Sequence, residues 1–288
     1  MIRAGAMSER VSASWFRLFC FSLWLGLTHL VRSLLGSGPL SLSEAVKRIL
    51  IPMDISRYFE LSVVVDELRD GEVVLDCSSP KLAAFYGACR HPGSMFVALD
   101  KFQKEILAWE PLRQTASLRN VNLQVADMVW LPFKDCSFDR VFSISVIEHL
   151  PDDLDSAALR EIYRVLKPGG VFQMTTPLAA SVSDVYLDED IYSDPPRPGR
   201  FFFYRNYDPE LYERKFKAPF AWKALSEQVC EDRRLPLLHW FAKTARLSYL
   251  AGPVLWVAAL LNLKISPYEK GRPPARRADI YASFRKPA

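Results

Sequence analysis

Short apolar runs alternate with stretches of helical character from Val73 to about Thr175, and this alternation limits the possible folds more than any other feature of the chain. We predict strands and helices in turn, with strands at Val73–Asp76, Met95–Leu99, Leu123–Ala126, Arg140–Ser145 and Gly170–Thr175 and helices around Lys81–Ala88, Lys101–Trp109 and Ser156–Leu166. Strands separated by helices of this length indicate an α/β fold with a parallel sheet covered on both faces. Because crossovers between parallel strands are right-handed, the sheet is expected to be doubly wound.

The regions on either side extend this pattern. Two further helices are expected upstream, over Ser41–Leu50 and Tyr58–Leu68. Downstream, Leu235–Lys243 and Ala278–Lys286 have the character of strands, and an uncharged run lies between them. This order fits a sheet that ends in a hairpin with a hydrophobic insertion, because too few residues remain for the core of a separate C-terminal domain.

Composition and charge exclude several classes of protein. The chain has 288 residues, of which 50% are hydrophobic and 24% charged, so it can bury a sizeable core and is not expected to be disordered. The net charge of +4 is too small to indicate nucleic-acid binding, although it suits contact with anionic lipid. The five cysteines are scattered without the spacing of a zinc site, so we expect reduced thiols in a cytoplasmic protein and no structural metal.

Two apolar segments stand apart from the α/β pattern. Leu18–Val31 is flanked by Arg17 and Arg32, and Leu247–Leu263 carries no charge. Each is slightly shorter than the roughly 20 apolar residues of a transmembrane helix. A signal peptide is disfavoured, because no convincing cleavage site of small residues follows the first segment. We predict an apolar N-terminal helical segment over residues 1–40 and a domain over residues 41–288, with an apolar insertion at about residues 246–265.

Three aspartates lie at the predicted ends of strands, where a doubly wound sheet binds its ligands. Asp76 closes the first strand, and Asp100 closes the second, 24 residues later. An acid at the second position can accept hydrogen bonds from the ribose of an adenosine cofactor, and Asp127, after the third strand, can accept one from an adenine amino group. Each acid alone is equally well explained as a helix cap or turn former, but the pair at this spacing favours nucleoside binding.

The motifs that follow give these acids a family context. "LPF" at residues 131–133, "FDRVFSISVIEHLP" at residues 138–151 and "VLKPGGVF" at residues 165–172 follow the three aspartates in order. This order resembles the class I S-adenosylmethionine-dependent methyltransferases, in particular the type 11-like small-molecule branch, over about residues 73–177. The resemblance implies a seven-stranded Rossmann-like sheet in which Leu235–Lys243 is the sixth strand and Ala278–Lys286 the antiparallel last one. An apolar helix at the N-terminus and an apolar helical insertion before the last strand complete the expected fold.

The resemblance also implies S-adenosylmethionine as the cofactor and assigns residues to it. The implied cofactor-binding residues follow four strand ends: Asp76, Ser78 and Ser79 beside the methionine part, Asp100 and Lys101 at the ribose and adenosine, Asp127 and Met128 at the adenine, and Ser143 and Ile144 at the sulfonium.

The loop after Asp76 departs from the family. The family has glycines at alternating positions after the acid, where this sequence has Ser78, Pro80 and Leu82. Glycine permits positive φ and close approach of a ligand, whereas proline removes an N–H donor. In one interpretation the serine hydroxyls replace the lost backbone contacts, and Pro80 stiffens the turn. In the other, cofactor binding has decayed and the fold survives as a scaffold. The intact downstream acids favour the first.

His149 is the candidate general base in catalysis, since a base assists methyl transfer to a hydroxyl. It is one of four histidines and lies in the "IEHLP" stretch after the fourth predicted strand. A purely structural hydrogen bond at a helix start explains it at least as well, and Glu148 has the same two interpretations. Tyr204 and Tyr207 either face the acceptor or pack in the core.

The apolar segments bear on the substrate. If the resemblance holds, both emerge near the mouth of the active site. There they either pack together as a buried lid or form a platform that dips into a bilayer, with Arg272, Arg276 and Arg277 meeting headgroups.

We therefore predict a methyltransferase for an apolar small molecule or lipid-like acceptor, either cytoplasmic or peripheral at a membrane surface, with no nucleic-acid partner. The alternative is a non-catalytic methyltransferase-like binding or scaffold protein. A nicotinamide-dependent oxidoreductase is disfavoured, since the GxGxxG fingerprint is missing.

Overall fold

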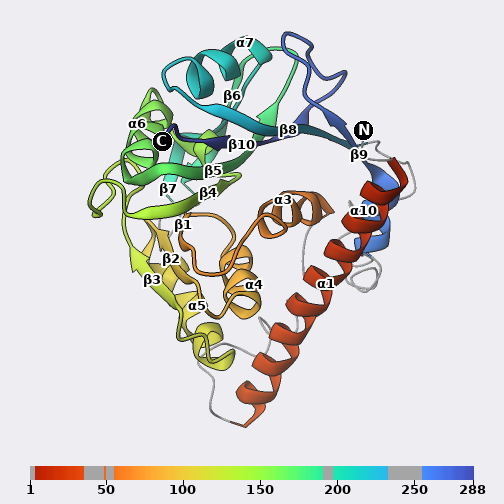
Figure 1. The fold of residues 1–288 in the computed structure, drawn as a ribbon, viewed down its shortest axis with the longest axis vertical. Helices are drawn as coiled ribbons and strands as arrows, with labels where there is room; N and C mark the ends of the chain where they lie inside the picture. The colour runs from red at the N-terminus through yellow and green to blue at the C-terminus, as the bar shows by residue number, and fades with distance from the viewer. Residues whose placement is uncertain (1–3, 36–48, 50–54, 191–196, 233–254) are drawn as a thin grey trace.

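The structure is a computed structural model, and it describes residues 4–35, 49, 55–190, 197–232 and 255–288. Over these residues the main sheet has eight strands in the order β3-β2-β1-β4-β5-β10-β8-β9 (Figure 1). The strands are β1 (Val73–Cys77), β2 (Met95–Asp100), β3 (Val121–Val125), β4 (Phe138–Ile144), β5 (Leu166–Leu178), β8 (Lys223–Asp232), β9 (Leu263–Pro267) and β10 (Ala278–Arg285). The first five are parallel, whereas β10 is antiparallel to its neighbours β5 and β8.

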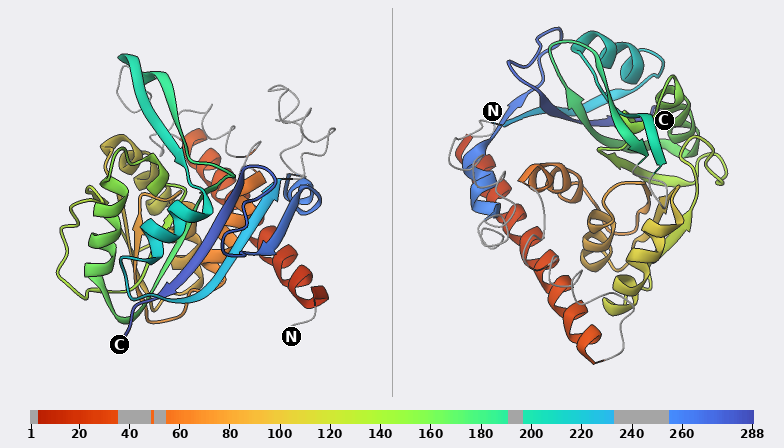
Figure 2. Two further views of the ribbon diagram at one scale, coloured as in Figure 1. Left: turned by 90° about the horizontal axis from the view of Figure 1, so that it is seen from above. Right: turned by 180° about the vertical axis from the view of Figure 1, so that it is seen from behind.

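Helices cover both faces of this sheet (Figures 1 and 2). One buried hydrophobic cluster lies under α1 (Ala4–Leu34), α3 (Ile55–Val65), α4 (Leu82–Arg90), α5 (Gln103–Thr115) and α10 (Leu255–Asn262). The other lies under α6 (Leu154–Val165), α7 (Pro209–Tyr212) and η2 (Glu213–Lys217). Successive strand residues alternate between the two clusters, as Val74 and Leu75 of β1 do, because side chains alternate across a strand. This burial on both faces explains why the strands are continuous apolar runs.

The predicted α/β fold is confirmed, including the antiparallel last strand. Two details differ. The place predicted for Leu235–Lys243, beside the last strand, is taken by β8, and residues 235–243 lie outside the described part of the chain. The edge strand β9 makes eight strands where seven were expected, because the end of the apolar insertion pairs with β8 after α10. Of the helix predicted over Ser41–Leu50, all but one residue lies outside the described part. The division at residue 40 stays a prediction.

The helix α1 runs along the outside of the domain and packs against α3, α4, α5 and α10 (Figure 1). Its inner face is fixed by polar as well as apolar contacts. The Ser14 hydroxyl donates to Asp66 Oδ1 at 2.7 Å, and Trp15 Nε1 donates to Ser62 Oγ at 2.9 Å. Within the described residues, Ala13–Arg32 is the one helical stretch long and apolar enough to cross a membrane by length and composition, which is weak evidence because 44% of it is buried in the protein.

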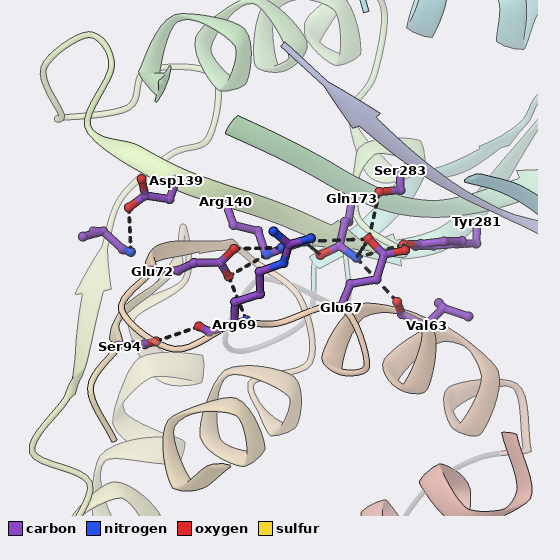
Figure 3. A network of polar contacts seen from close by, with 11 residues as sticks. Val63, Glu67, Arg69, Glu72, Ser94, Asp139, Arg140, Gln173, Tyr281 and Ser283 are labelled. Atoms are coloured by element: carbon purple, nitrogen blue, oxygen red, sulfur yellow. Dashed lines mark hydrogen bonds and ion pairs between the residues drawn. The ribbon is translucent and has the colours of Figure 1, made fainter. Parts of the chain in front are cut away.

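A buried network of polar side chains holds the strands together near their amino ends (Figure 3). Arg140 of β4 is 2% exposed and donates from Nε and Nη2 to the two carboxylate oxygens of Glu72, at 2.9 Å each. Its Nη1 donates to Gln173 Oε1 of β5 at 2.9 Å. Gln173 Nε2 donates in turn to Tyr281 Oη of β10, at 2.8 Å, and to Glu67. The network thus ties the chain entering β1 to β4, β5 and β10, at the end of the parallel strands opposite to the one where such sheets bind ligands.

A second, two-stranded sheet formed by β6 (Ser183–Asp190) and β7 (Arg197–Asn206) projects from the body of the domain (Figure 2). It follows β5 in the chain and contacts the short helix η1 (Ile147–His149). The aromatic "FFFY" stretch at residues 201–204 belongs to β7. This two-stranded sheet, called the ribbon from here on, therefore brings aromatic side chains to the carboxyl end of β4.

Candidate cofactor site

The candidate site lies where the order of the parallel strands reverses. β1 pairs with β2 on one side and β4 on the other, so the crossovers leave their carboxyl ends in opposite directions. Doubly wound sheets bind ligands in the crevice that such a reversal opens. Asp76 and the loop after it stand at this point.

One residue of the loop after β1, Ser78, has a backbone conformation that glycine favours. Ser78 has a φ of +59°, in the left-handed region, which costs a non-glycine residue about 1 kcal/mol. Hydrogen bonds on both sides hold it there. The Ser78 amide donates to Leu99 O at 3.1 Å, and Ser79 Oγ accepts from the Ile144 amide at 2.8 Å. The loop is therefore fixed to both β2 and β4.

Lys81, which directly precedes α4, is a member of the site that sequence reasoning missed. Its side chain is 2% exposed, and its ammonium lies between the loop and the end of β2. Nζ donates to Ser79 O at 2.8 Å and pairs with Asp100 Oδ2 at 3.3 Å. The signal available in the sequence was a lysine within a loop that otherwise holds only small residues and proline.

Asp76 is fully buried, and burial raises the pKa of its carboxyl to about 6 against the opposing charge of Lys81. Its Oδ1 accepts a hydrogen bond from the Ser79 amide at 2.9 Å, whereas its Oδ2 is buried and has no hydrogen-bond partner among the described residues. An unsatisfied buried carboxylate oxygen is costly, and native structures retain few of them. Asp76 therefore has an acceptor to offer to a cationic or hydroxyl group that reaches it.

Asp100, at the end of β2, is 8% exposed and is held from two sides. Its Oδ1 accepts from the Phe102 amide at 3.1 Å, and its Oδ2 faces Lys81. An ionised carboxylate has about four acceptor positions, so these two contacts leave it able to bind a diol.

The other predicted cofactor residues form a second group around β3 and β4. Lys101 Nζ pairs with Asp127 Oδ2 at 2.8 Å, and Asp127 Oδ1 caps the following turn through the Val129 amide at 3.1 Å. Met128 is 3% exposed and packs in the hydrophobic cluster under α6. Ser143 donates to Cys77 O at 3.4 Å, so the end of β4 is joined to β1. These positions are compatible with the predicted roles in cofactor binding, which stay predictions.

His149 lies in η1, beyond the carboxyl end of β4, where the ribbon reaches the body. Its Nδ1 is 2.6 Å from Phe203 O, and because a carbonyl oxygen only accepts, Nδ1 carries the proton. Burial lowers the pKa of the imidazole, and the nearby charges of Arg57 and Arg277 lower it further. The ring is therefore neutral at pH 7, and its second nitrogen, Nε2, is the basic one.

The residues around His149 have different positions. Glu148 is buried, and burial raises the pKa of its carboxyl to about 8, so it is largely protonated at pH 7. Tyr204 accepts a hydrogen bond from Arg277 Nη1 at 2.9 Å, and its ring centroid is 6.1 Å from that of His149. Tyr207 is fully buried and donates to Asp155 Oδ2 at 3.0 Å, so it is a packing residue.

The side chains present fit the chemistry of S-adenosylmethionine. The site combines the unpartnered Asp76 oxygen, which suits an ammonium, with the Asp100 carboxylate, which suits a ribose diol. Strand order, strand reversal and acids at the ends of β1 and β2 together define a class I methyltransferase fold.

Comparison with known proteins agrees with this assignment. Residues 81–174 match the family model described as a methyltransferase domain, and the match begins at Lys81, just after the unusual loop. The demethylmenaquinone methyltransferase of Staphylococcus epidermidis is 41% identical over 81 residues, covering 26% of this chain and 33% of the relative. The cycloartenol-C-24-methyltransferase of Arabidopsis thaliana is 31% identical over 106 residues, covering 36% and 31%. The chain thus spans about a third of the length of these relatives. Residues 81–174 thus match a methyltransferase domain, and the sheet around them has the Rossmann-like fold of class I methyltransferases.

Solved structures show the same fold over most of the chain. The cyclase SpnF superposes with a TM-score of 0.54 at 19% identity, covering 92% of this chain and 94% of that one. The YcgJ protein of Bacillus subtilis gives 0.51 at 18% identity, covering 80% and 99%. Since a cyclase is among these structures, the fold alone does not determine the reaction. The reaction has to be inferred from the residues of the site.

Proposed function

We propose that this protein is an S-adenosylmethionine-dependent methyltransferase that acts on a hydrophobic small molecule or lipid-like acceptor. The observation that carries the proposal is the buried group at the strand reversal, in which Ser79 and Lys81 of the loop after β1 join Asp76 to Asp100. The family match immediately downstream supports it.

When bound, the cofactor would supply a methyl group already activated on a sulfonium, so the chain needs mainly to bind, align and exclude water. Asp100 would hold the ribose hydroxyls, and Asp76 the amino group of the methionine part. Ser143 and Ile144 would line the sulfonium side at the end of β4. His149 would accept the proton of a hydroxyl acceptor at Nε2, since its Nδ1 proton is engaged by Phe203 O.

The region around His149 supports an apolar acceptor. The rings of Phe203 and Tyr204 lie with centroids 5.1 Å and 6.1 Å from that of His149. The relatives named above act on demethylmenaquinone and cycloartenol according to their names, and both are largely hydrocarbon. An acceptor of this class would place its polar atom at His149 and its hydrocarbon part against the ribbon.

Transfer of labelled methyl groups tests the activity. The full chain is incubated with S-adenosylmethionine carrying a tritiated methyl group and with a total lipid extract, and label is counted after partition into organic solvent. We expect label in the organic phase with the parent and a rate at least tenfold lower with Asp100→Ala. Folded protein that transfers no label above the level of Asp100→Ala would support the scaffold alternative.

We further propose that the protein is cytoplasmic and attaches peripherally to a membrane surface through α1. Between residues 16 and 34, one face of this helix is apolar and exposed, and it comprises Phe16, Cys20, Trp24, Leu27, Val31 and Leu34. The opposite face is buried, for example at Trp15 and Leu18. A helix packed along one side on the protein can lie in the plane of the interface, but spanning the bilayer would strip that side from the domain.

Flotation with vesicles of phosphatidylcholine and phosphatidylglycerol tests the attachment. Point substitutions are preferable to truncation, because removing α1 would uncover its buried contacts. We expect the double variant Trp24→Glu/Leu27→Glu to float several-fold less than the parent. Trp130→Glu, which alters an equally prominent apolar side chain that is 83% exposed elsewhere, should float like the parent. Equal flotation of all three proteins would contradict the attachment.

A further inference from the structure

Lys81 is a buried cation that none of the roles above explains. It is 2% exposed, and its ammonium contacts only polar groups of the candidate site in the described structure: Ser79 O at 2.8 Å and Asp100 Oδ2 at 3.3 Å. Desolvation of an ammonium is costly unless anions and hydrogen bonds compensate for it. The chain therefore stabilises this cation with the same carboxylate that the proposed function assigns to the ribose.

The position of Lys81 lets it control the orientation of the Asp100 carboxylate. Asp100 Oδ1 is fixed by the Phe102 amide two residues later, but Oδ2 meets no other donor than Lys81 among the hydrogen bonds of the described residues. Without the ammonium, the carboxylate would keep one contact and could rotate about it. Lys81 thus fixes the plane of the carboxylate whose remaining acceptor positions face a ligand.

The unusual loop after β1 explains why the contact between Lys81 and Asp100 matters for binding. A glycine-rich loop binds a cofactor through its own exposed amides. In this loop the Ser78 and Ser79 amides already donate to Leu99 O and Asp76 Oδ1. Pro80 has no amide hydrogen. Recognition must therefore depend more on the side chains at the strand ends, and on Asp100 in particular.

We propose that Lys81 is a positioning residue for nucleoside recognition: by bridging Ser79 O and Asp100, it holds the Asp100 carboxylate in the orientation that binds the 2′,3′-diol of an adenosine. This inference rests on the proposed function, because it concerns the same cofactor. It predicts that Lys81 acts on the nucleoside end of the ligand and only through Asp100. Direct binding of the cofactor's carboxylate by Lys81 would act on the amino-acid end instead.

A double-mutant cycle read by ligand binding tests the inference. Dissociation constants are measured calorimetrically for the parent, Lys81→Met, Asp100→Asn and the double variant. Two ligands are compared: S-adenosylhomocysteine, and 5′-methylthioadenosine, which has the same nucleoside but no amino-acid group. Losing a hydrogen bond to a charged group weakens binding by about tenfold or more, so we expect Lys81→Met to weaken both ligands by about tenfold. The double variant should bind no more weakly than Asp100→Asn alone, since the two residues act as one unit.

Conservative and matched variants separate positioning from general stability. Lys81→Arg keeps the cation and should restore affinity to within a few-fold of the parent. Lys215 is the matched control, because it is a lysine of 14% exposure that pairs with buried Asp155 at 2.6 Å. Lys215→Met should lower the urea midpoint and leave both dissociation constants unchanged. If Lys81→Met does not fold by circular dichroism, Lys81→Gln takes its place in the cycle.

The outcomes are distinct. Weakening confined to S-adenosylhomocysteine would overturn the inference in favour of direct binding at the amino-acid end, and additive losses in the double variant would overturn it as well. Either result leaves the proposed function standing. Failure of the parent to bind either ligand at millimolar concentration would overturn the proposed function and this inference with it.

Discussion

Replacing Asp76 by asparagine should make the protein more stable while it abolishes cofactor binding. Asp76 is fully buried, and burial is the main reason that its pKa is raised from 3.8 to about 6. The unfolded chain ionises this carboxyl more readily than the folded protein does. Folding at pH 7 or above therefore carries the cost of keeping an ionised carboxylate in the interior.

The size of the gain in stability follows from the rise in the pKa of Asp76. About two pH units correspond to roughly 3 kcal/mol, at 1.36 kcal/mol per unit. Asparagine keeps the acceptor for the Ser79 amide but places an amide nitrogen where Oδ2 meets no partner in the described part of the chain, at a cost of about 1–2 kcal/mol. We expect Asp76→Asn to raise the free energy of unfolding by about 1–2 kcal/mol at pH 8.

The difference in unfolding free energy between Asp76→Asn and the parent should depend on pH. The raised pKa means that the parent loses stability as pH rises from about 4 to about 6, so the advantage of Asp76→Asn should appear across that window and be absent below pH 4. Urea unfolding followed by tryptophan fluorescence at pH 4 and pH 8 measures it. Asp139→Asn is the opposite control: despite its burial, bonds from Lys167 and the Val73 amide lower the pKa of Asp139, so this variant should lose stability at pH 8. An Asp76→Asn variant that is less stable than the parent at pH 8, or a difference in stability that does not change with pH, would show that the buried Asp76 carboxylate does not destabilise the folded protein.

Two further predictions concern the polar network and the candidate base. Arg140→Met should lower the free energy of unfolding by about 3–5 kcal/mol, because it takes both hydrogen bonds of Arg140 away from the Glu72 carboxylate, whose side chain is only 15% exposed. Urea unfolding at pH 7 measures this, and a loss under 1 kcal/mol would contradict it. His149→Gln should lower kcat by about 10²-fold or more at unchanged affinity for S-adenosylhomocysteine, as measured by methyl transfer and calorimetry. Because burial lowers the pKa of His149, the parent's rate should fall only below about pH 6.5, and a profile that already falls at pH 7.5 would exclude this histidine as the base.

The positions of the parallel strands were predictable because they depend on local sequence patterns. Each parallel strand is an apolar run buried on both faces, and the aspartates at the ends of β1 and β2 mark the ligand edge. The strand reversal between β1 and β4 follows from the resemblance to the family. These features depend on residues close in sequence or on the order of motifs.

What sequence reasoning missed depends on contacts between distant residues. Lys81 meets Asp100 across 19 residues, and the Nδ1 partner of His149 lies 54 residues downstream in β7. Arg140 pairs with Glu72 across 68 residues. Periodicity does not encode such pairs, since each partner taken alone looks like an ordinary polar residue. The edge strand β9 escaped for a related reason: it continues an apolar helix, and only its pairing with β8 makes it a strand.

Calorimetric titration of S-adenosylmethionine into the full chain, for the parent and for Asp100→Ala, shows whether the loop after β1 still forms a cofactor site. This loop of serines and proline is fixed to β2 and β4 by Ser78 and Ser79 and joined to Asp100 by Lys81. We predict saturable binding of one equivalent to the parent and no measurable heat of binding to folded Asp100→Ala. A folded parent that binds no S-adenosylmethionine, or an Asp100→Ala variant that binds it as tightly as the parent, would contradict the account.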